Sequence, residues 1–174
     1  MTIEVIENIL SDELLNKLHE YVISNSHEYI WRNATTAWPS DVSAGSVPVM
    51  IMNLDNFRDQ LYSEVSKKVL GIKELELELP FPMLHAIPPM GFMGWHEDYN
   101  PVNVTIYLNE FWDKQWGGLF LYEENEQIKA IKPRFNTGVI VSMNQPHGVS
   151  MIPYTCPVNR YSIQLFFTER KDYE

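Results

Sequence analysis

The sequence predicts an α+β domain in which two helices precede a core of β-strands. Up to about residue 71, apolar residues recur at helical spacing, and beyond it short β-rich runs alternate with turn residues. The 174 residues suit one domain of ordinary size, and 45% of them are hydrophobic, which is enough to bury a core. We therefore expect a single domain over 1–174, helical over about 1–71 and with a β-core over about 75–168.

The first helix is predicted to begin at Ser11, whose hydroxyl can cap the helix. Two acidic residues follow in the first turn, where the helix dipole favours negative charge. Leu14, Leu18 and Val22 then recur every four residues and form one apolar stripe.

A second helix is predicted over about 55–70, and Gly71 is expected to end it as a C-cap. Its apolar residues keep a four-residue rhythm: Phe57, Leu61, Val65 and Val69. Between the helices, Trp31–Asn53 contains Pro39 and Gly45 and shows no sustained period. A loop of this length in a compact domain is often functional, and we interpret it as a candidate lid.

The β-core is predicted from short runs bounded by turn residues. The runs are Leu75–Leu79, Met83–Ile87, Val102–Leu108, Leu119–Tyr122, Gln127–Ile131, Gly138–Ser142, Val149–Ile152 and Arg160–Thr168. Their spacing favours a sandwich or barrel over alternating strand and helix units.

Charge and cysteine content exclude several classes of function. The net charge is −10 and no Lys/Arg stripe is present, which argues against nucleic-acid binding. Cys156 is the single cysteine, so an internal disulfide and a CxxC motif are both excluded. No signal peptide or membrane-length apolar stretch is evident. We expect a soluble, cytoplasmic protein with no membrane partner.

A candidate metal site is suggested by His96 and Asp98. Because side chains alternate along an extended strand, both residues would point to one side and Glu97 to the other. His147 follows an apolar run and is the natural third ligand. Two imidazoles and one carboxylate on one face leave coordination positions open, as in non-haem Fe(II) oxygenases. A lone His-x-Asp more often marks a surface turn.

A candidate anion site is suggested by the last strand. Arg160, Ser162 and Gln164 share one face of it, and the apolar residues share the other. A surface strand would explain this pattern. If Arg160 instead points inward, it needs a partner, and a dicarboxylate matches its two-pronged donor set. Ser162 could add a hydroxyl donor, and Tyr107 could donate from a neighbouring strand or simply pack.

Taken in order, these motifs resemble the prolyl 4-hydroxylase-like branch of the 2-oxoglutarate/Fe(II) oxygenase superfamily. The resemblance covers about Pro82 to Thr168. It rests on His96-x-Asp98, Tyr107-Leu108-Asn109 with Trp112, Gly117-Gly118-Leu119, Pro133-Arg134-Phe135, His147 and Arg160-Tyr161-Ser162-Ile163.

The resemblance implies a double-stranded β-helix (a jelly-roll, cupin-like core) with the N-terminal helices packed outside. It implies that His96, Asp98 and His147 ligate Fe(II), and that Arg160 and Tyr107 bind the distal carboxylate of 2-oxoglutarate. The implied reaction consumes 2-oxoglutarate and O₂, yields succinate and CO₂, and hydroxylates a C–H bond. A peptidyl prolyl residue is the favoured substrate, with other protein side chains and small molecules left open. Ascorbate is also left open as an additional requirement.

The chain departs from the family pattern at one position. Related enzymes often carry a second tyrosine on the strand before the His-x-Asp motif, but His85 is the polar aromatic residue there. His85 could take over that role. Trp95, Tyr99 and Asn100 flank the expected ligands and could line the mouth, with Met90 and Met93 just upstream.

Three rival readings differ in what they leave unexplained. A cupin-like barrel that binds metal or a small ligand, without 2-oxoglutarate, leaves Arg160 and Tyr107 without a role. If the chain were a pure interaction protein, the three expected metal ligands would have no role. A zinc hydrolase would usually carry HExxH on a helix, which is absent here.

Overall fold

The computed structural model describes residues 3–24, 30–33 and 48–169. Its elements, in chain order, are β1 (Glu4–Glu7), α1 (Asp12–Ser24), β2 (Ile30–Asn33), β3 (Pro48–Asn53), η2 (Asp55–Phe57), α3 (Arg58–Lys68), α4 (Leu70–Glu74), β4 (Met83–Ile87), β5 (Met93–His96), β6 (Val102–Tyr107), η3 (Lys114–Trp116), β7 (Phe120–Glu124), β8 (Gln127–Ile131), β9 (Thr137–Ser142), β10 (His147–Val149) and β11 (Arg160–Phe167). Among these described residues, no helix is long and apolar enough to cross a membrane.

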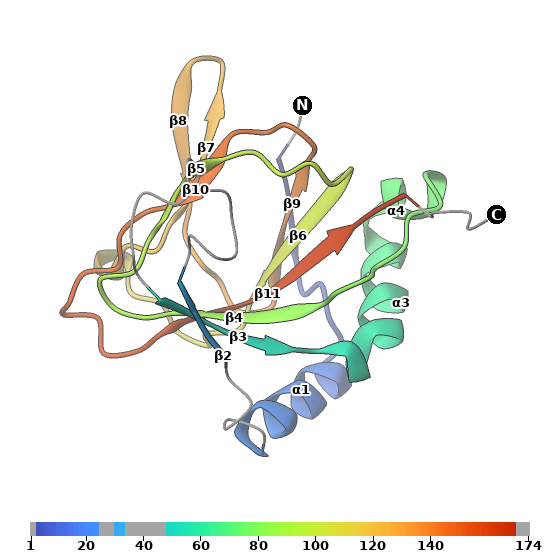
Figure 1. The fold of residues 1–174 in the computed structure, drawn as a ribbon, viewed down its shortest axis with the longest axis horizontal. Coiled ribbons are helices and arrows are strands. Elements are labelled where there is room, and N and C mark those ends of the chain that lie inside the picture. The colour runs from blue at the N-terminus through green and yellow to red at the C-terminus, as the bar shows by residue number, and fades with distance from the viewer. Residues whose placement is uncertain (1–2, 25–29, 34–47, 170–174) are drawn as a thin grey trace.

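The strands form two antiparallel sheets. The larger has the order β1-β9-β6-β11-β4-β3-β2, and the smaller has the order β5-β10-β7-β8. From β4 to β11 the chain passes back and forth between the two sheets, which is the connectivity of a jelly roll. The helices lie on one side of the large sheet, and the small sheet lies on the other (Figure 1).

The main hydrophobic core fills the space between the helices and the large sheet. On β11, Ile163, Leu165 and Phe167 are buried on this face, together with leucines of α1 and α3. Since side chains alternate along a strand, Arg160 and Ser162 point to the opposite face, toward the small sheet. The alternation along β11 therefore separates the structural core from a polar interior.

The first helix agrees with the prediction, whereas the second is divided. The amide of Leu14 donates to the Ser11 hydroxyl at 3.3 Å, so Ser11 caps α1 as expected. The second helix is divided into η2, α3 and α4, and α3 ends before α4 because Val69 has extended backbone angles (φ −105, ψ 93). Gly71 lies inside α4 and is not the predicted C-cap. The break at Val69 buries both Val69 and Ile72 in the main core.

Several strand predictions were wrong. Leu75–Leu79 alternates Leu and Glu but forms no strand, because only Glu78 bridges to Thr168 while Leu77 and Leu79 enter the helical core. The expected strand Val149–Ile152 is displaced, since β10 covers His147–Val149.

The part before residue 71 is not purely helical. Three strands that the sequence did not reveal, β1, β2 and β3, join the large sheet there. The ends of the predicted Trp31–Asn53 loop are therefore strands. Its middle, which includes Trp38, Pro39 and Asp41 of the candidate lid, lies outside the described residues.

Candidate metal centre

His96 and His147 lie opposite one another in the small sheet. His96 ends β5 and His147 begins β10, and the antiparallel register pairs the two residues directly. Their ring centroids are 4.2 Å apart. Asp98 lies two residues beyond β5, with its Oδ2 3.5 Å from Nε2 of His147. One ligand atom from each of the three residues lies within 4.8 Å of the others. The three residues that the sequence singled out thus converge on one point.

Both imidazoles are held through Nδ1 by backbone carbonyls. Nδ1 of His96 lies 2.8 Å from the Gly94 oxygen, and Nδ1 of His147 lies 2.8 Å from the Gln145 oxygen. Because a carbonyl oxygen only accepts hydrogen bonds, each Nδ1 carries the hydrogen, which leaves the lone pair of the neutral ring on Nε2. Metal-binding histidines are commonly oriented by such a bond.

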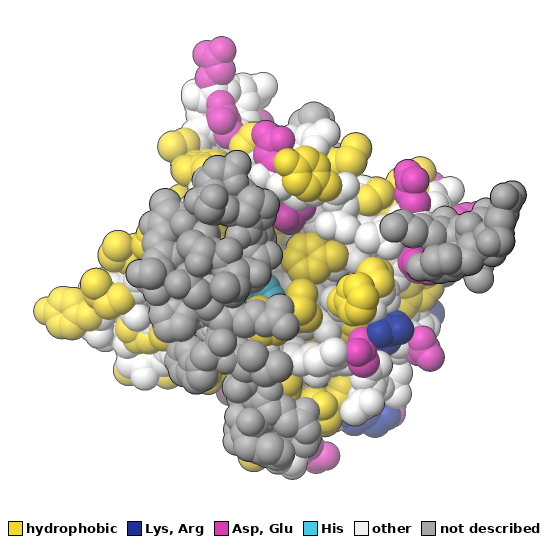
Figure 2. All heavy atoms as spheres, viewed as in Figure 1, with side chains coloured by type: hydrophobic (Ala, Val, Ile, Leu, Met, Phe, Trp, Pro, Cys, Tyr) yellow, Lys and Arg dark blue, Asp and Glu magenta, His cyan; other side chains and the backbone are white. Residues whose placement is uncertain are grey.

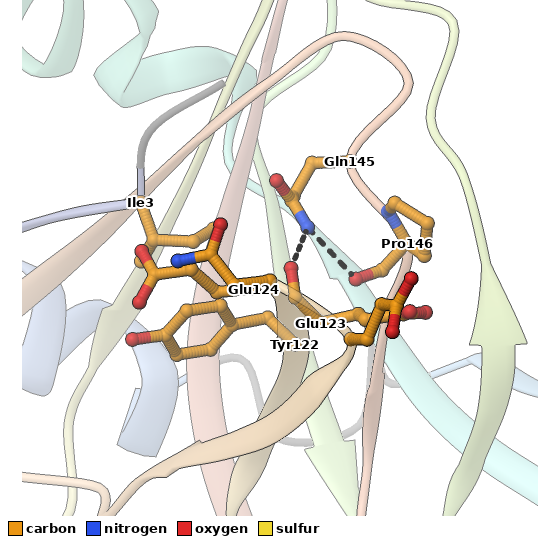
Figure 3. A pocket seen from close by; sticks show the side chains of 8 residues that line it. Ile3, Tyr122, Glu123, Glu124, Gln145 and Pro146 are labelled. Atoms are coloured by element: carbon orange, nitrogen blue, oxygen red, sulfur yellow. Dashed lines mark hydrogen bonds between the residues drawn. The ribbon is translucent and has the colours of Figure 1, made fainter.

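The segment that delivers His147 is fixed to β7. The Gln145 amide donates to the carbonyl of Glu123 at 2.8 Å and to that of Pro146 at 3.3 Å (Figure 3). Gly148 lets β10 pack closely on β5, because a Cβ there would lie only 3.0 Å from the Met93 carbonyl oxygen. The loop bond and the close strand packing together set the position of His147.

Burial keeps this centre in a form that can accept a cation. Burial lowers the pKa of His96 below its ordinary value, and the nearby His147 lowers it further, while the Gly94 carbonyl and Asp98 act in the opposite direction. A neutral imidazole is the form that binds metals. Phe120 stacks on His147 with ring centroids 5.3 Å apart and shields that side of the ring.

Arg160 is buried on the inner face of the large sheet. It is 1% exposed, its Nε donates to the Gly118 carbonyl at 2.9 Å, and its Nη1 donates to the Ser162 hydroxyl at 3.2 Å. Its guanidinium carbon lies 4.9 Å from the centroid of the Tyr107 ring. Within the described part of the chain, no carboxylate forms an ion pair with Arg160, and its Nη2 makes no hydrogen bond.

The surroundings of Arg160 favour the binding of an anion. Burial lowers the pKa of Arg160, but a guanidinium remains protonated in proteins. Burial also raises the pKa of Tyr107, while the nearby Arg160 acts in the opposite direction, so its hydroxyl keeps its hydrogen. That hydroxyl lies close to Arg160 but has no hydrogen-bond partner of good geometry among the described residues. Two buried donors thus point to an acceptor that this part of the chain does not provide.

A line of hydrogen bonds runs from Arg160 along the inner face. The Gln164 amide donates to the Ser162 hydroxyl at 2.9 Å, and the Thr105 hydroxyl donates to the Gln164 oxygen at 2.8 Å. Ser162 therefore accepts from both Arg160 and Gln164. Ser162 is wholly buried, and its hydroxyl helps to fix the orientation of the guanidinium.

The metal centre and Arg160 share one cavity between the two sheets. The cavity is partly open to solvent. The polar lining comprises His85, His96, Asp98, Asn103, Thr105, His147, Arg160 and Gln164, and the apolar lining comprises Ile87, Met93, Phe120, Val141, Val149 and Phe166. In the space-filling view, a histidine side chain is visible in a recess beside hydrophobic side chains (Figure 2).

The structure thus gathers every site residue that the sequence predicted. Tyr107 lies against the guanidinium, and His85 lines the cavity directly across the sheet from Ser162. Trp95 and Tyr99 are 42% and 82% exposed. Trp112 donates its indole N–H to the Gly117 carbonyl at 2.9 Å and so packs beside the Gly117-Gly118 segment.

Two polar residues of the cavity wall, Asn103 and Thr105, were not identified from the sequence as functional. Outside the lining, the carbonyl of Gly118 accepts from Arg160 Nε, a contact that the sequence did not reveal. Asn103 and Thr105 alternate with Tyr107 on one face of β6, so the period-two pattern could have found them.

Comparison with known proteins gives a consistent family and fold. A family model described as the 2OG-Fe(II) oxygenase superfamily matches residues 82–168. A search of the curated proteins finds no match.

Three solved structures illustrate the likeness in fold. A prolyl-4-hydroxylase from Pseudomonas putida has a TM-score of 0.71 and 19% identity, over 97% of this chain and 93% of that one. A prolyl hydroxylase from Trichoplax adhaerens, in complex with a hypoxia inducible factor peptide fragment, has a TM-score of 0.69 and 18% identity, over 96% and 83%. A viral collagen prolyl hydroxylase from Paramecium Bursaria Chlorella virus-1, in complex with 2OG, has a TM-score of 0.68 and 11% identity, over 98% and 97%. These matches confirm the double-stranded β-helix.

Proposed function

The chain belongs to the 2OG-Fe(II) oxygenase superfamily, and we propose that His96, Asp98 and His147 hold its Fe(II) while Arg160 anchors 2-oxoglutarate. The enzyme is a 2-oxoglutarate-dependent dioxygenase. One observation carries the assignment of residues: a single cavity has lone pairs converging at one end and buried, unpaired donors at the other.

The metal end fits a divalent cation. It offers two imidazole Nε2 atoms and one carboxylate, with ligand atoms within 4.8 Å of one another. Without a cation, these lone pairs face each other at close range, which is unfavourable. Two imidazoles and one carboxylate on a single side of the metal leave the other positions open for ligands, as Fe(II) oxygenases require.

The opposite end fits a carboxylate. Arg160 Nη2 and the Tyr107 hydroxyl are buried donors without a partner in the described chain. A carboxylate accepts from both, and the planar guanidinium matches its two oxygens. The cavity therefore suits a molecule with a carboxylate at the Arg160 end and metal-binding oxygens at the other end. 2-Oxoglutarate has both groups.

When bound, Fe(II) and 2-oxoglutarate would supply the oxidation with O₂ as the oxidant: one oxygen atom of O₂ enters succinate as 2-oxoglutarate loses CO₂, and the other becomes the hydroxyl on the substrate carbon. The chain supplies position and shielding. Arg160 and Tyr107 orient the acid, Ser162 holds the guanidinium in place, and apolar side chains such as Phe120 and Val141 exclude bulk water from the cavity.

We further propose that His85 takes the place of the tyrosine that related enzymes carry on the preceding strand. Its position supports this role, because it is 3% exposed, lines the cavity and lies directly across from Ser162 in the sheet. An imidazole can donate to a carboxylate, as a phenol can.

The proposed substrate is a prolyl residue in a peptide. All three structures described above are prolyl hydroxylases, and one holds a peptide fragment. On this chain, Trp95 and Tyr99 flank the metal ligands and are exposed, which suits contact with an extended peptide. Peptides with and without proline should therefore be compared for substrate-dependent succinate release.

The central test is anaerobic absorbance spectroscopy. Fe(II) and 2-oxoglutarate should together give a weak visible charge-transfer band, because the keto acid binds the metal through two oxygens. Iron-loaded, folded protein that gives no band would favour the alternative, a cupin-like metal-binding barrel without 2-oxoglutarate chemistry. Succinate release that depends on both iron and 2-oxoglutarate would complete the assignment.

A further inference from the structure

Asn103 is a buried amide for which the described chain provides no partner. It is 5% exposed, and neither its Nδ2 nor its Oδ1 makes a hydrogen bond. It lines the same cavity as His96, Asp98 and His147. Buried polar groups are nearly always paired, so an amide in this state at a cavity wall indicates a partner that enters the cavity.

The neighbouring protein groups are unsuited or already engaged. The residues beside Asn103 on the two flanking strands are Val141 and Phe166, which offer no polar side-chain atoms. The next inward residue on β6, Thr105, donates its hydroxyl to Gln164. The line of hydrogen bonds from Arg160 therefore ends at Thr105 and leaves the Asn103 amide free to bind a ligand.

The position along β6 limits what the ligand can be. Tyr107 and Asn103 are four residues apart on one face, which corresponds to about 13 Å of strand. A five-carbon diacid anchored at Arg160 and Tyr107 is shorter than that, so it does not extend along the strand as far as Asn103. Asn103 lies at the other end of β6, five residues after Asp98.

The chemistry of the amide narrows the choice further. Asn103 presents a donor and an acceptor, and both lack a partner. A carboxylate only accepts and would leave Oδ1 unpaired, whereas a water molecule both donates and accepts. Building on the proposed function, we infer that Asn103 hydrogen-bonds a water at the metal position that 2-oxoglutarate leaves open. Asn103 is then a positioning residue, because it sets how firmly that water is held.

The test compares full-length wild-type protein with Asn103→Leu and Asn103→Ala, each loaded with Mn(II) and 2-oxoglutarate. Mn(II) allows the water-proton relaxation rate to report water bound at the metal without turnover. Thr137→Val is the control, since it changes another buried polar side chain of the large sheet, one that is absent from the cavity lining. Unfolding temperatures of the metal-free proteins verify folding. Neither Asn103 variant should melt lower than Thr137→Val, because Asn103 makes no hydrogen bond to lose.

We expect both Asn103 variants to change the relaxation rate of the Mn(II)–2-oxoglutarate complex while the affinity for 2-oxoglutarate stays within about twofold of wild type. An unchanged relaxation rate would overturn the inference. A loss of 2-oxoglutarate affinity of about tenfold or more would overturn it too, and would assign the amide to the acid itself. If wild type bound no 2-oxoglutarate in the presence of Mn(II), the proposed function would fail instead.

Discussion

The metal end and the guanidinium end of the cavity are built in opposite ways. The metal end comes from the small sheet and offers only lone pairs, with His147 and Asp98 side chains 8% and 13% exposed. The guanidinium end comes from the large sheet and offers only donors, with Arg160 at 1% exposure. One end requires a cation and the other an anion.

The difference shows that each sheet contributes one end of the cavity. A short strand pair, β5 and β10, brings His96 and His147, two of the three proposed metal ligands, into direct register. A long central strand, β11, carries Arg160 into the interior, where water cannot compete for the guanidinium. Changes at one end should therefore leave binding at the other end largely intact, which the following variants test.

The largest effect is expected for His147→Ala. It removes one of three ligands from the centre, so iron binding should be lost and succinate release should fall at least about a hundredfold. Metal content after dialysis and a succinate assay measure the two effects. His19→Ala, at an exposed position of α1, is the control and should bind iron normally. Iron retained at wild-type stoichiometry in His147→Ala would contradict the assignment of the centre.

Arg160→Met should act on the opposite end. It removes the guanidinium but keeps most of the apolar volume, so 2-oxoglutarate affinity should fall by at least roughly a hundredfold, because breaking a buried charge pair costs about 3–5 kcal/mol. Iron affinity should persist. Anaerobic titration with 2-oxoglutarate and calorimetry with metal give both values. Arg134→Met is the control, since Arg134 is a surface residue paired with Glu7. Equal loss of metal and acid binding would defeat the separation of the two ends.

The chemistry of both ends could be predicted from the sequence because it depends on local order. Period-two alternation placed Arg160 and Ser162 on one face and Ile163 on the other, and the structure confirms this. The spacing of His96 and Asp98 predicted their convergence, although β5 ends at His96 and Asp98 lies beyond it. Side-chain direction follows from the backbone alone, so it is readable without knowledge of the neighbours.

The elements that escaped prediction depend on distant partners. β5 contains Gly94 and is four residues long, and β1 is a short edge strand with two glutamates, so neither shows a clear pattern. Leu75–Leu79 shows a perfect alternation, yet it forms no strand, since Leu77 and Leu79 pack in the main core and Leu75 is exposed. For Asn103 the sequence gives the face of β6, but its lack of a partner depends on the residues opposite it on two other strands.

Gly118→Ala should weaken the guanidinium end without touching the metal. Gly118 has φ +60, and a Cβ there would lie 2.9 Å from Trp112 and 3.1 Å from Cδ of Arg160. The left-handed backbone alone costs about 1–2 kcal/mol for alanine. We expect a lower unfolding temperature and a loss of 2-oxoglutarate affinity of roughly tenfold as the guanidinium is displaced. Metal affinity at wild-type level in the same sample provides the internal control. Unchanged 2-oxoglutarate affinity would mean that Arg160 tolerates the shift and is held mainly by Ser162.

Ser162→Ala should have the smallest effect of these variants. It tests how much the Ser162 hydroxyl contributes to holding the Arg160 guanidinium in place. The Ser162 hydroxyl accepts from Arg160 Nη1 at 3.2 Å and from Gln164 at 2.9 Å, so its loss frees the guanidinium to move without altering its charge. A hydrogen bond contributes about 0.5–1.5 kcal/mol, so 2-oxoglutarate affinity should fall by roughly threefold to tenfold, with iron affinity unchanged. Combining Ser162→Ala with Arg160→Met separates the two roles. If Ser162 acts only through Arg160, the double variant should bind 2-oxoglutarate as Arg160→Met does. A further drop in the double variant would show that Ser162 contacts the acid directly, because only then would its removal matter once the guanidinium is gone.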